Sequence, residues 1–351
     1  MRRVSFALML LCLCLSTLRS AAALPYDALY AFGDSLTDTG REPAPDIGYY
    51  MGRYSNGPLW VEYLSQRLGL AYSAANNHAE SGAQTDDTFG QVTNFFPSLS
   101  ITQSLFVVWA GGNDFLQTYD SNGIDDAKWN PQITNSVSHL SNAVVALHAI
   151  GARFILVPNQ VDLSEVPPTN KTPSEYRDYI RSKVQLFNTL LAQALDRVAA
   201  DLPDLRLFRV DMFAKFNALL QNAAAYGFTN TEEGALQDFN LFDKRFDGPG
   251  RNYVFWDIFH PTTKAHGIIA DWFQAVAAPL NPRLNLITNG GTRPDLALTQ
   301  LHLNATYVLR RSEDLNAWLD VQTFSTLATN LLISLTNDLP AAFYSVVLPA
   351  Q

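Results

Sequence analysis

The sequence is almost without cysteine. Only Cys12 and Cys14 are present among 351 residues, and both lie in an apolar run near the amino terminus. Once residues 1–23 are removed as a leader, the chain has no thiol, which excludes disulfide bonds, zinc–thiolate sites and a cysteine nucleophile. The fold must then rely on a packed core, and 47% hydrophobic residues are enough for a sizeable one.

The amino-terminal run has the parts of a secretory signal peptide. Arg2 and Arg3 precede the apolar residues 4–18, and small residues ending at Ala23 offer a cleavage site. The apolar run is too short for a comfortable membrane span, which disfavours an uncleaved anchor. We therefore expect residues 1–23 to be cleaved off and the protein to be secreted, periplasmic or exposed at the cell surface, with no obligate membrane anchor.

Positive charge is also scarce. The sequence has 24 Lys and Arg against 33 Asp and Glu, a formal net charge of −9, which becomes −12 when the three arginines of residues 1–23 are removed. This acidic balance argues against nucleic acid and against an anionic membrane as electrostatic partners. Because no histidine pair or carboxylate cluster has the spacing of metal ligands, we expect no metal and no cofactor.

Residues 28–40 read as a buried strand that stops abruptly at a hydroxyl. Five apolar or aromatic residues, 28–32, are followed by Gly-Asp-Ser at positions 33–35. Ligands bind at the carboxyl ends of the strands in an open parallel sheet, so Ser35 is a candidate nucleophile at the mouth of a site. On these residues alone, a strand that ends in a polar turn is the alternative.

A candidate base and its partner stand near the end of the α/β region. A serine hydroxyl needs a base, and the base works best when a carboxylate holds its ring. Asp257 and His260 lie three residues apart just before Pro261, so one irregular turn can supply both. An ordinary surface aspartate and a helix-capping histidine are the alternative. The order Ser, Asp, His matches the α/β-hydrolases, although their Gly-x-Ser-x-Gly elbow is absent.

Two further turns offer hydrogen-bond donors for an oxyanion. The apolar strand 105–109 runs into a glycine pair and then Asn113, whose amide can donate a hydrogen bond to a developing negative charge. Gly82, in the segment 77–83, offers a backbone N–H. Each of these segments, taken alone, is an ordinary turn.

Together these segments resemble the sequence blocks of the GDSL, or SGNH, hydrolases. Four blocks occur in the order and roughly at the spacing of that family: Gly33-Asp34-Ser35-Leu36, Ser81-Gly82, Gly111-x-Asn113-Asp114 and Asp257-x-x-His260. The resemblance covers residues 26–278. Within it, residues 52–62 are similar to the branch that contains plant-type esterases, bacterial lipases and secreted acyltransferase-like haemolysins. The chain departs from many relatives at Arg41, where they carry asparagine.

The resemblance implies a flavodoxin-like, three-layer α/β/α hydrolase with a parallel five-stranded sheet. It implies Ser35 as nucleophile, His260 as base and Asp257 as the residue that orients it. The N–H groups of Ser35 and Gly82 and the side chain of Asn113 would form the oxyanion hole. The expected function is cleavage of carboxylic esters through an acyl-enzyme on Ser35, of the esterase or lipase type. The alternatives are a polysaccharide O-acetylesterase or acyltransferase, and a non-catalytic surface binding protein that kept the fold.

Alternating strand and helix patterns indicate a parallel sheet with helices on both faces. We expect strands at residues 28–32, 70–75, 105–109, 153–157 and 205–210, and helices at 59–68, 88–96, 133–150, 173–200, 211–222 and 261–277. The loop 43–56 follows Ser35 closely enough to wall the site, and we expect residues 227–251 to line it as a loop.

From residue 281 onward, short apolar runs separated by polar turns predict a small β-rich module. We therefore divide the chain into a signal peptide (1–23), a hydrolase domain (24–280) and a carboxy-terminal module (281–351). Residues 307–318 resemble small β modules appended to secreted bacterial proteins. Binding to the cell surface or to carbohydrate, sorting, and a stabilising cap are all open roles for this module.

The expected substrate of the enzyme is a small-molecule, lipid or carbohydrate ester.

Overall fold

The computed structural model describes residues 26–97, 100–278, 283–287, 295–299, 301, 306–313, 317–326, 330–334 and 343–347. The signal peptide expected at residues 1–23, together with its two cysteines, lies outside the described residues and stays a prediction. None of the helices in the described ranges is long and apolar enough to cross a membrane.

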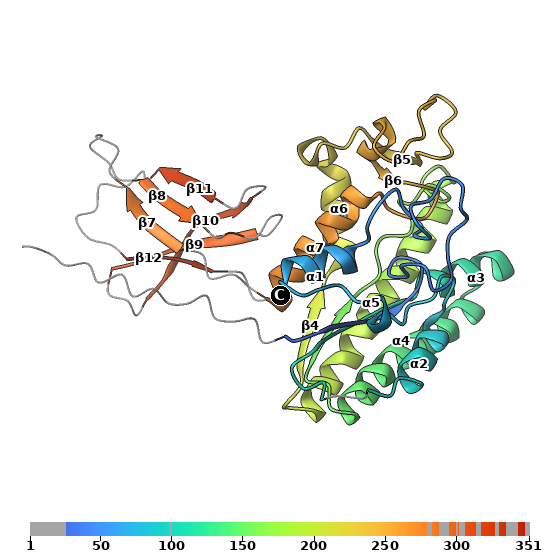
Figure 1. Ribbon diagram of the computed structural model, residues 1–351, viewed down its shortest axis with the longest axis horizontal. Coiled ribbons are helices and arrows are strands. Elements are labelled where there is room, and N and C mark those ends of the chain that lie inside the picture. Colours follow the sequence, from blue (N-terminus) through green and yellow to red (C-terminus); the bar gives the residue numbers. More distant parts are fainter. Residues whose placement is uncertain are drawn as a thin grey trace, which may run out of the picture.

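A parallel four-stranded sheet lies at the centre of the larger part of the molecule (Figure 1). Its strands, in spatial order, are β1 (Leu29–Gly33), β2 (Leu105–Trp109), β3 (Phe154–Pro158) and β4 (Arg206–Val210). Every residue of β2 is buried. A strand that is covered on both faces carries a continuous apolar run rather than an alternating one, which is the pattern seen in Leu-Phe-Val-Val-Trp.

Helices cover both faces of this sheet and create two hydrophobic cores. Alternate residues of β2 contribute to opposite cores: Leu105 and Val107 pack in one, and Phe106 and Val108 in the other. The first core is closed by α1 (Trp60–Arg67), α6 (Met212–Gln221) and α7 (Thr263–Ala277), and the second by α2 (Thr85–Thr93), α3 (Gly112–Asn122), α4 (Asp126–Ala149) and α5 (Ser174–Asp201). The predicted three-layer α/β/α architecture is confirmed.

The strand predicted at residues 70–75 is not formed, so the central sheet has four strands in the described residues instead of five. This segment is coil that leads into a short 3-10 turn, η1 (Ala74–Asn76). Residues 71, 74 and 75 are exposed, so the segment lacks the buried side chains that stabilise a strand in a covered sheet. Pairing with β1 begins only after it, at the parallel bridge between Ala31 and Asn77 and the hydrogen bonds from the His78 and Glu80 N–H groups to the Ala31 and Gly33 carbonyls.

The other predicted elements of this part are formed, with their ends shifted by a few residues. The helix expected from residue 133 begins seven residues earlier, because the Asp125 side chain caps it by accepting a hydrogen bond from the Ala127 N–H. Residues 227–251 are not only loop. They contain β5 (Asn230–Gly234), which pairs with β6 (Tyr253–Phe255), and end in the 3-10 turn η3 (Pro249–Asn252).

The described residues after position 281 form two antiparallel sheets of three strands. One sheet has the order β11 (Asn330–Ser334), β8 (Asp295–Thr299), β7 (Arg283–Ile287), and the other β10 (Leu319–Ser325), β9 (Thr306–Ser312), β12 (Phe343–Val347). They share a small core in which Leu298 and Tyr307 are fully buried. The predicted β-rich character is confirmed, whereas the boundary placed at residue 281 stays a prediction.

Candidate active site

The turn that carries Ser35 is set by the glycine at the end of β1. Gly33 has a φ of +154°, and a Cβ at this position would lie 2.1 Å from the carbonyl oxygen of Trp109 on the neighbouring strand. Only glycine allows the two backbones to approach so closely. The Gln91 side chain bonds both the N–H and the C=O of Gly33 at 2.9 Å. The chain therefore leaves the sheet sharply and presents Ser35 at its carboxyl edge.

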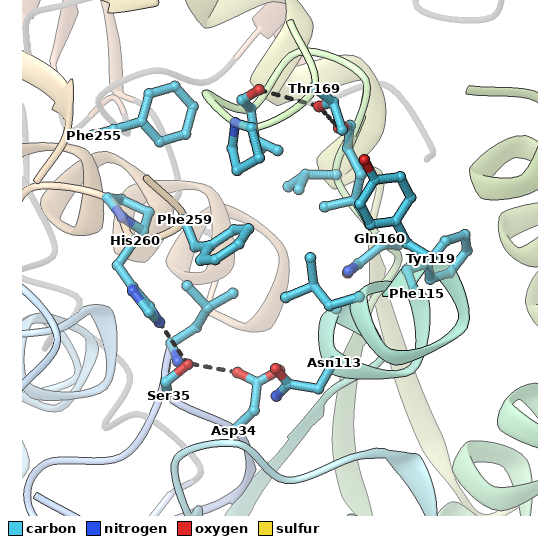
Figure 2. Close-up of a pocket in the computed structure, with 18 of the residues that line it drawn as sticks. Asp34, Ser35, Asn113, Phe115, Tyr119, Gln160, Thr169, Phe255, Phe259 and His260 are labelled. Carbon is cyan, nitrogen blue, oxygen red and sulfur yellow. Dashed lines mark hydrogen bonds between the residues drawn. The ribbon is translucent and has the colours of Figure 1, made fainter. Parts of the chain in front are cut away.

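Ser35, His260 and Asp257 form one hydrogen-bonded chain. Ser35 Oγ lies 2.7 Å from His260 Nε2 (Figure 2), and His260 Nδ1 lies 2.9 and 2.8 Å from the two carboxylate oxygens of Asp257. Asp257 Oδ1 also accepts the backbone N–H groups of Phe259 and His260. Burial raises the pKa of Asp257, but the hydrogen bond and charge of His260 and these backbone donors outweigh it and hold the pKa below its ordinary value.

Gly82 and Asn113 line the same cavity as Ser35 and His260. Asn113 lies in the first turn of α3, where its Nδ2 donates a hydrogen bond of 2.9 Å to the Ala83 carbonyl. An amide nitrogen carries two hydrogens, so one donation orients the group while the other N–H stays able to donate. Gly82 has a φ of +85°, which favours glycine. Four of the five site residues expected from the sequence thus line one cavity, and the fifth, Asp257, is buried and bonds to His260.

Asp38 links the Ser35 turn to the Gly82 turn, a role that the sequence analysis missed. This buried carboxylate accepts the backbone N–H groups of residues 40–42 at 2.7–2.9 Å. Its Oδ2 also accepts both the N–H and the hydroxyl of Ser81, at 2.9 and 3.0 Å. An aspartate followed by Thr-Gly is a common turn former, and that was the available signal. The partner Ser81, 43 residues away, has no such signal.

The loop 43–56 walls the site, as expected, through Tyr54, and it carries a second tyrosine, Tyr49, that contacts the catalytic-site carboxylate. Tyr54 lines the cavity, and its ring centroid lies 4.8 Å from that of His260. Tyr49 donates a hydrogen bond of 2.8 Å to Asp257 Oδ2. The loop therefore contacts both the imidazole and the carboxylate.

The expectation that residues 227–251 line the site is wrong for the cavity that holds Ser35. None of the described residues of this segment is among those that line it. The segment packs behind the loop 43–56 instead, because Phe246 places its ring against Tyr50 and Trp256. Its pairing through β5 supports the strand β6, which leads into the Asp257 turn.

The cavity that Ser35 and His260 line is largely apolar and has a volume of about 430 Å³. Figure 2 shows Ser35 and His260 on one side and Phe115 and Tyr119 of α3 on the other. Apolar side chains from α3, from the segment after β3 and from α5 form much of its wall: Phe115, Leu116, Val161, Leu163, Val166, Pro168 and Ile180. In the described part of the chain, no group of three or more His, Cys, Asp or Glu could hold a metal ion.

A family model described as GDSL-like lipase/acylhydrolase matches residues 29–273, well over half of the sequence. The chain belongs to this family. A GDSL esterase/lipase of Arabidopsis thaliana is 28% identical over 322 residues, covering 72% of this chain and 84% of the relative. The phosphatidylcholine-sterol acyltransferase of Aeromonas hydrophila is 29% identical and covers 62% and 68%. Among solved structures, the acetylxylan esterase Axe2 from Geobacillus stearothermophilus aligns with a TM-score of 0.45 at 17% identity, over 73% of this chain and 96% of that one.

Membership of this family makes the protein a serine hydrolase of carboxylic esters. The expected family and reaction class are confirmed, and with them the non-catalytic binding protein is set aside. The matched residues 29–273 contain the Ser35–His260–Asp257 chain and both oxyanion-hole candidates, Gly82 and Asn113.

We expect Asp38→Ala to lower the free energy of unfolding by about 2–4 kcal/mol, because it leaves the donors of residues 40–42 and Ser81 without their acceptor. Urea denaturation measures the change. Asp46→Ala, which removes an exposed carboxylate from the neighbouring loop, is the control and should stay within about 0.5 kcal/mol of the wild type. Equal stability of the two variants would contradict the linking role of Asp38.

Proposed function

We propose that the protein cleaves esters of extended acyl chains through an acyl-enzyme on Ser35, with His260 as base and Asp257 as its orienting partner. The observation that supports these roles is the hydrogen bond of 2.7 Å between Ser35 Oγ and His260 Nε2, continued from His260 Nδ1 to Asp257. A nucleophile, a base and a base-orienting group in hydrogen-bond contact are the arrangement that acyl transfer by serine requires.

In the first half of the reaction, His260 Nε2 takes the hydroxyl proton as Ser35 Oγ bonds to the ester carbonyl carbon. The negative charge on the carbonyl oxygen is stabilised by the N–H groups of Ser35 and Gly82 and by the amide of Asn113. The C–O bond to the alcohol then breaks, and the alcohol leaves with the proton held by His260. In the second half, water attacks the acyl carbon as His260 Nε2 takes its proton. The bond between that carbon and Ser35 Oγ then breaks, the acid leaves, and His260 returns the proton to Ser35 Oγ.

Asp257 selects the tautomer that this cycle needs. With the proton of the neutral imidazole on Nδ1 and donated to Asp257, the lone pair of Nε2 faces Ser35 Oγ. When the ring becomes an imidazolium in the transition state, the adjacent carboxylate stabilises the new charge.

The apolar cavity supports an extended acyl chain as part of the substrate. The cavity of about 430 Å³ is far larger than an acetyl group needs, since a water molecule takes up roughly 30 Å³ of liquid. An acetyl group would leave most of this apolar surface without a partner, which is the reason to prefer a long-chain ester over the O-acetylesterase alternative. Burial of each methylene contributes about 0.8 kcal/mol.

The division of the chain is part of the same proposal. The antiparallel sheets have a hydrophobic core of their own, which among the described residues takes only Ala275 of α7 from the larger part, and this supports a hydrolase domain at residues 24–280 and a module at 281–351. The described residues of the module contribute nothing to the lining of the cavity, so we assign the module no part in the chemistry. Its role at a cell surface or on carbohydrate, and export through residues 1–23, rest on the sequence.

Ser35→Ala should lower kcat by about 10⁴-fold or more, because it removes the atom that becomes acylated. Hydrolysis of p-nitrophenyl esters measures the loss. Ser100→Ala, the same change at an exposed serine, is the control and should keep full activity. Retention of most of the activity by Ser35→Ala would refute the assignment.

Asn113→Ala should lower kcat by about a hundred- to a thousandfold and change KM little, since its hydrogen bond forms with charge that develops in the transition state. Steady-state kinetics on one ester separate the two parameters. Asn94→Ala, at an exposed asparagine, serves as control. A rise in KM with unchanged kcat would place Asn113 in ground-state binding instead.

For esters from acetate to palmitate, kcat/KM should rise by about tenfold for each pair of added methylenes until the cavity is filled. Leu116→Trp, which fills the cavity from α3, should remove this advantage for long chains and spare acetate. Gln117→Trp, one residue further along the helix at an exposed position, is the matched control. A preference for acetate in the wild type would favour the O-acetylesterase.

A further inference from the structure

The carboxylate of Asp257 has a hydrogen-bond donor that the reaction scheme does not use. The Tyr49 hydroxyl lies 2.8 Å from Asp257 Oδ2, the same oxygen that lies 2.8 Å from His260 Nδ1. Tyr49 and Asp257 are separated by 208 residues of sequence. The Tyr54 ring packs against the rings of both Tyr49 and His260, at centroid distances of 5.2 and 4.8 Å.

The loop that carries Tyr49 is tied to the Asp257 turn at several points. Trp256, the residue before Asp257, donates its indole N–H to the Gly48 carbonyl at 2.6 Å. The Ser55 hydroxyl donates to the Pro261 carbonyl at 2.9 Å. Bonds on both sides of Tyr49 therefore hold the loop against the segment that contains Asp257.

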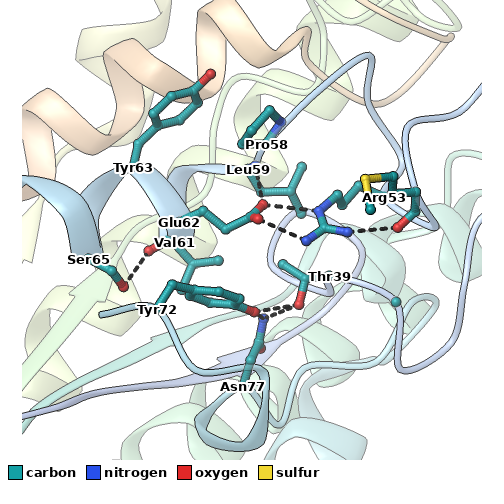
Figure 3. A network of polar contacts seen from close by, with 12 residues as sticks. Thr39, Arg53, Pro58, Leu59, Val61, Glu62, Tyr63, Ser65, Tyr72 and Asn77 are labelled. Carbon is teal, nitrogen blue, oxygen red and sulfur yellow. Dashed lines mark hydrogen bonds and ion pairs between the residues drawn. The ribbon is translucent and has the colours of Figure 1, made fainter. Parts of the chain in front are cut away.

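A second anchor joins this loop to α1. Figure 3 shows the Arg53 guanidinium in a forked contact with Glu62, with Nε and Nη2 donating at 3.1 and 2.8 Å. Glu62 also accepts the N–H of Leu59 at the start of the helix, and Arg53 donates to the Met51 carbonyl. A two-point arginine–carboxylate contact fixes direction as well as distance, so the loop is held in a defined position.

We propose that Tyr49 is a positioning residue of the reaction: its hydroxyl fixes the plane of the Asp257 carboxylate and moderates the basicity that Asp257 confers on His260. This inference rests on the proposed function, because it assigns Tyr49 an effect on the base of that scheme. Tyr49 is not among the described residues that line the cavity, so it acts through Asp257 and not on the substrate.

The physical reason is competition for one oxygen. A donor on Oδ2 draws off negative charge, and a carboxylate with one donor fewer stabilises the imidazolium more strongly. Loss of the Tyr49 hydroxyl should therefore strengthen the attraction of Asp257 for a protonated His260 ring. Burial, the charge of Asp257 and the hydrogen bond to it all raise the pKa of Tyr49 above its ordinary value, so the hydroxyl stays protonated and remains a donor through neutral pH.

Other groups face the imidazole and need to be accounted for. Asp34, after β1, is close enough to interact with His260, and burial raises the pKa of Asp34 to about 6. On α7, burial lowers the pKa of His266 to about 3, with a smaller effect from His260, so His266 stays neutral. Tyr54 packs on the ring itself. All three groups are present in wild type and variant alike, so a difference between their pH profiles reports the Tyr49 hydroxyl.

The test is the pH profile of kcat/KM for Tyr49→Phe, which keeps the ring and removes only the hydroxyl. We expect the acidic limb to move upward by about 0.5 to 1 pH unit. On the plateau, kcat should fall by about three- to tenfold because the carboxylate is less well oriented, while KM stays unchanged. Tyr50→Phe is the matched control, since the Tyr50 ring packs against Phe246, and it should reproduce the wild-type profile.

If the acidic limb of the pH profile of Tyr49→Phe stays at its wild-type position, the proposal is overturned even if kcat falls. A purely structural role would lower the plateau of the profile without moving its acidic limb. An increase confined to KM would overturn it as well. NMR titration of the His260 ring in a Ser35→Ala background, with and without Tyr49→Phe, measures the same shift without turnover. An active Ser35→Ala variant would refute the proposed function, whereas an unmoved His260 titration would refute only the role of Tyr49.

Discussion

The structure depends on keeping a buried carboxylate, Asp257, charged beside the imidazole of His260. A buried charge is costly unless donors surround it, and Asp257 receives four: two backbone N–H groups of its own turn, the His260 ring and the Tyr49 hydroxyl. The turn that contains Asp257 and the loop 43–56 are held in the positions from which these donors reach the carboxylate. The requirement of one carboxylate thus joins segments from both ends of the hydrolase fold.

A second buried carboxylate organises the opposite side of the site in the same way. Asp38 collects donors from residues 40–42 and from Ser81, so that the Ser35 turn and the Gly82 turn are held together. In the proposed mechanism, proton transfer and oxyanion binding are therefore each supported by their own aspartate. Between them the apolar cavity opens toward α3 and α5, where an acyl chain has room.

Local pattern was sufficient for much of the architecture. The strand at residues 105–109 is formed where it was predicted, because five consecutive apolar residues between turns can be satisfied only by burial on both faces. The strand predicted at residues 70–75 is not formed, because its side chains are not buried on both faces. Five of the six residues there are apolar, but three of these are alanines, which bury little surface, and residues 71, 74 and 75 are exposed instead of completing the sheet.

The sequence by itself determined the family, the reaction class and the set of residue types that this chemistry requires, since Ser35, Asp257 and His260 stand in short, ordered blocks with local turn signals. Only the tertiary structure decided what surrounds them. Tyr49 meets Asp257 across 208 residues, and the cavity is assembled from segments that share no local pattern. Such contacts arise from packing of distant elements, and the periodicity and spacing of one segment carry no information about the partner it will meet.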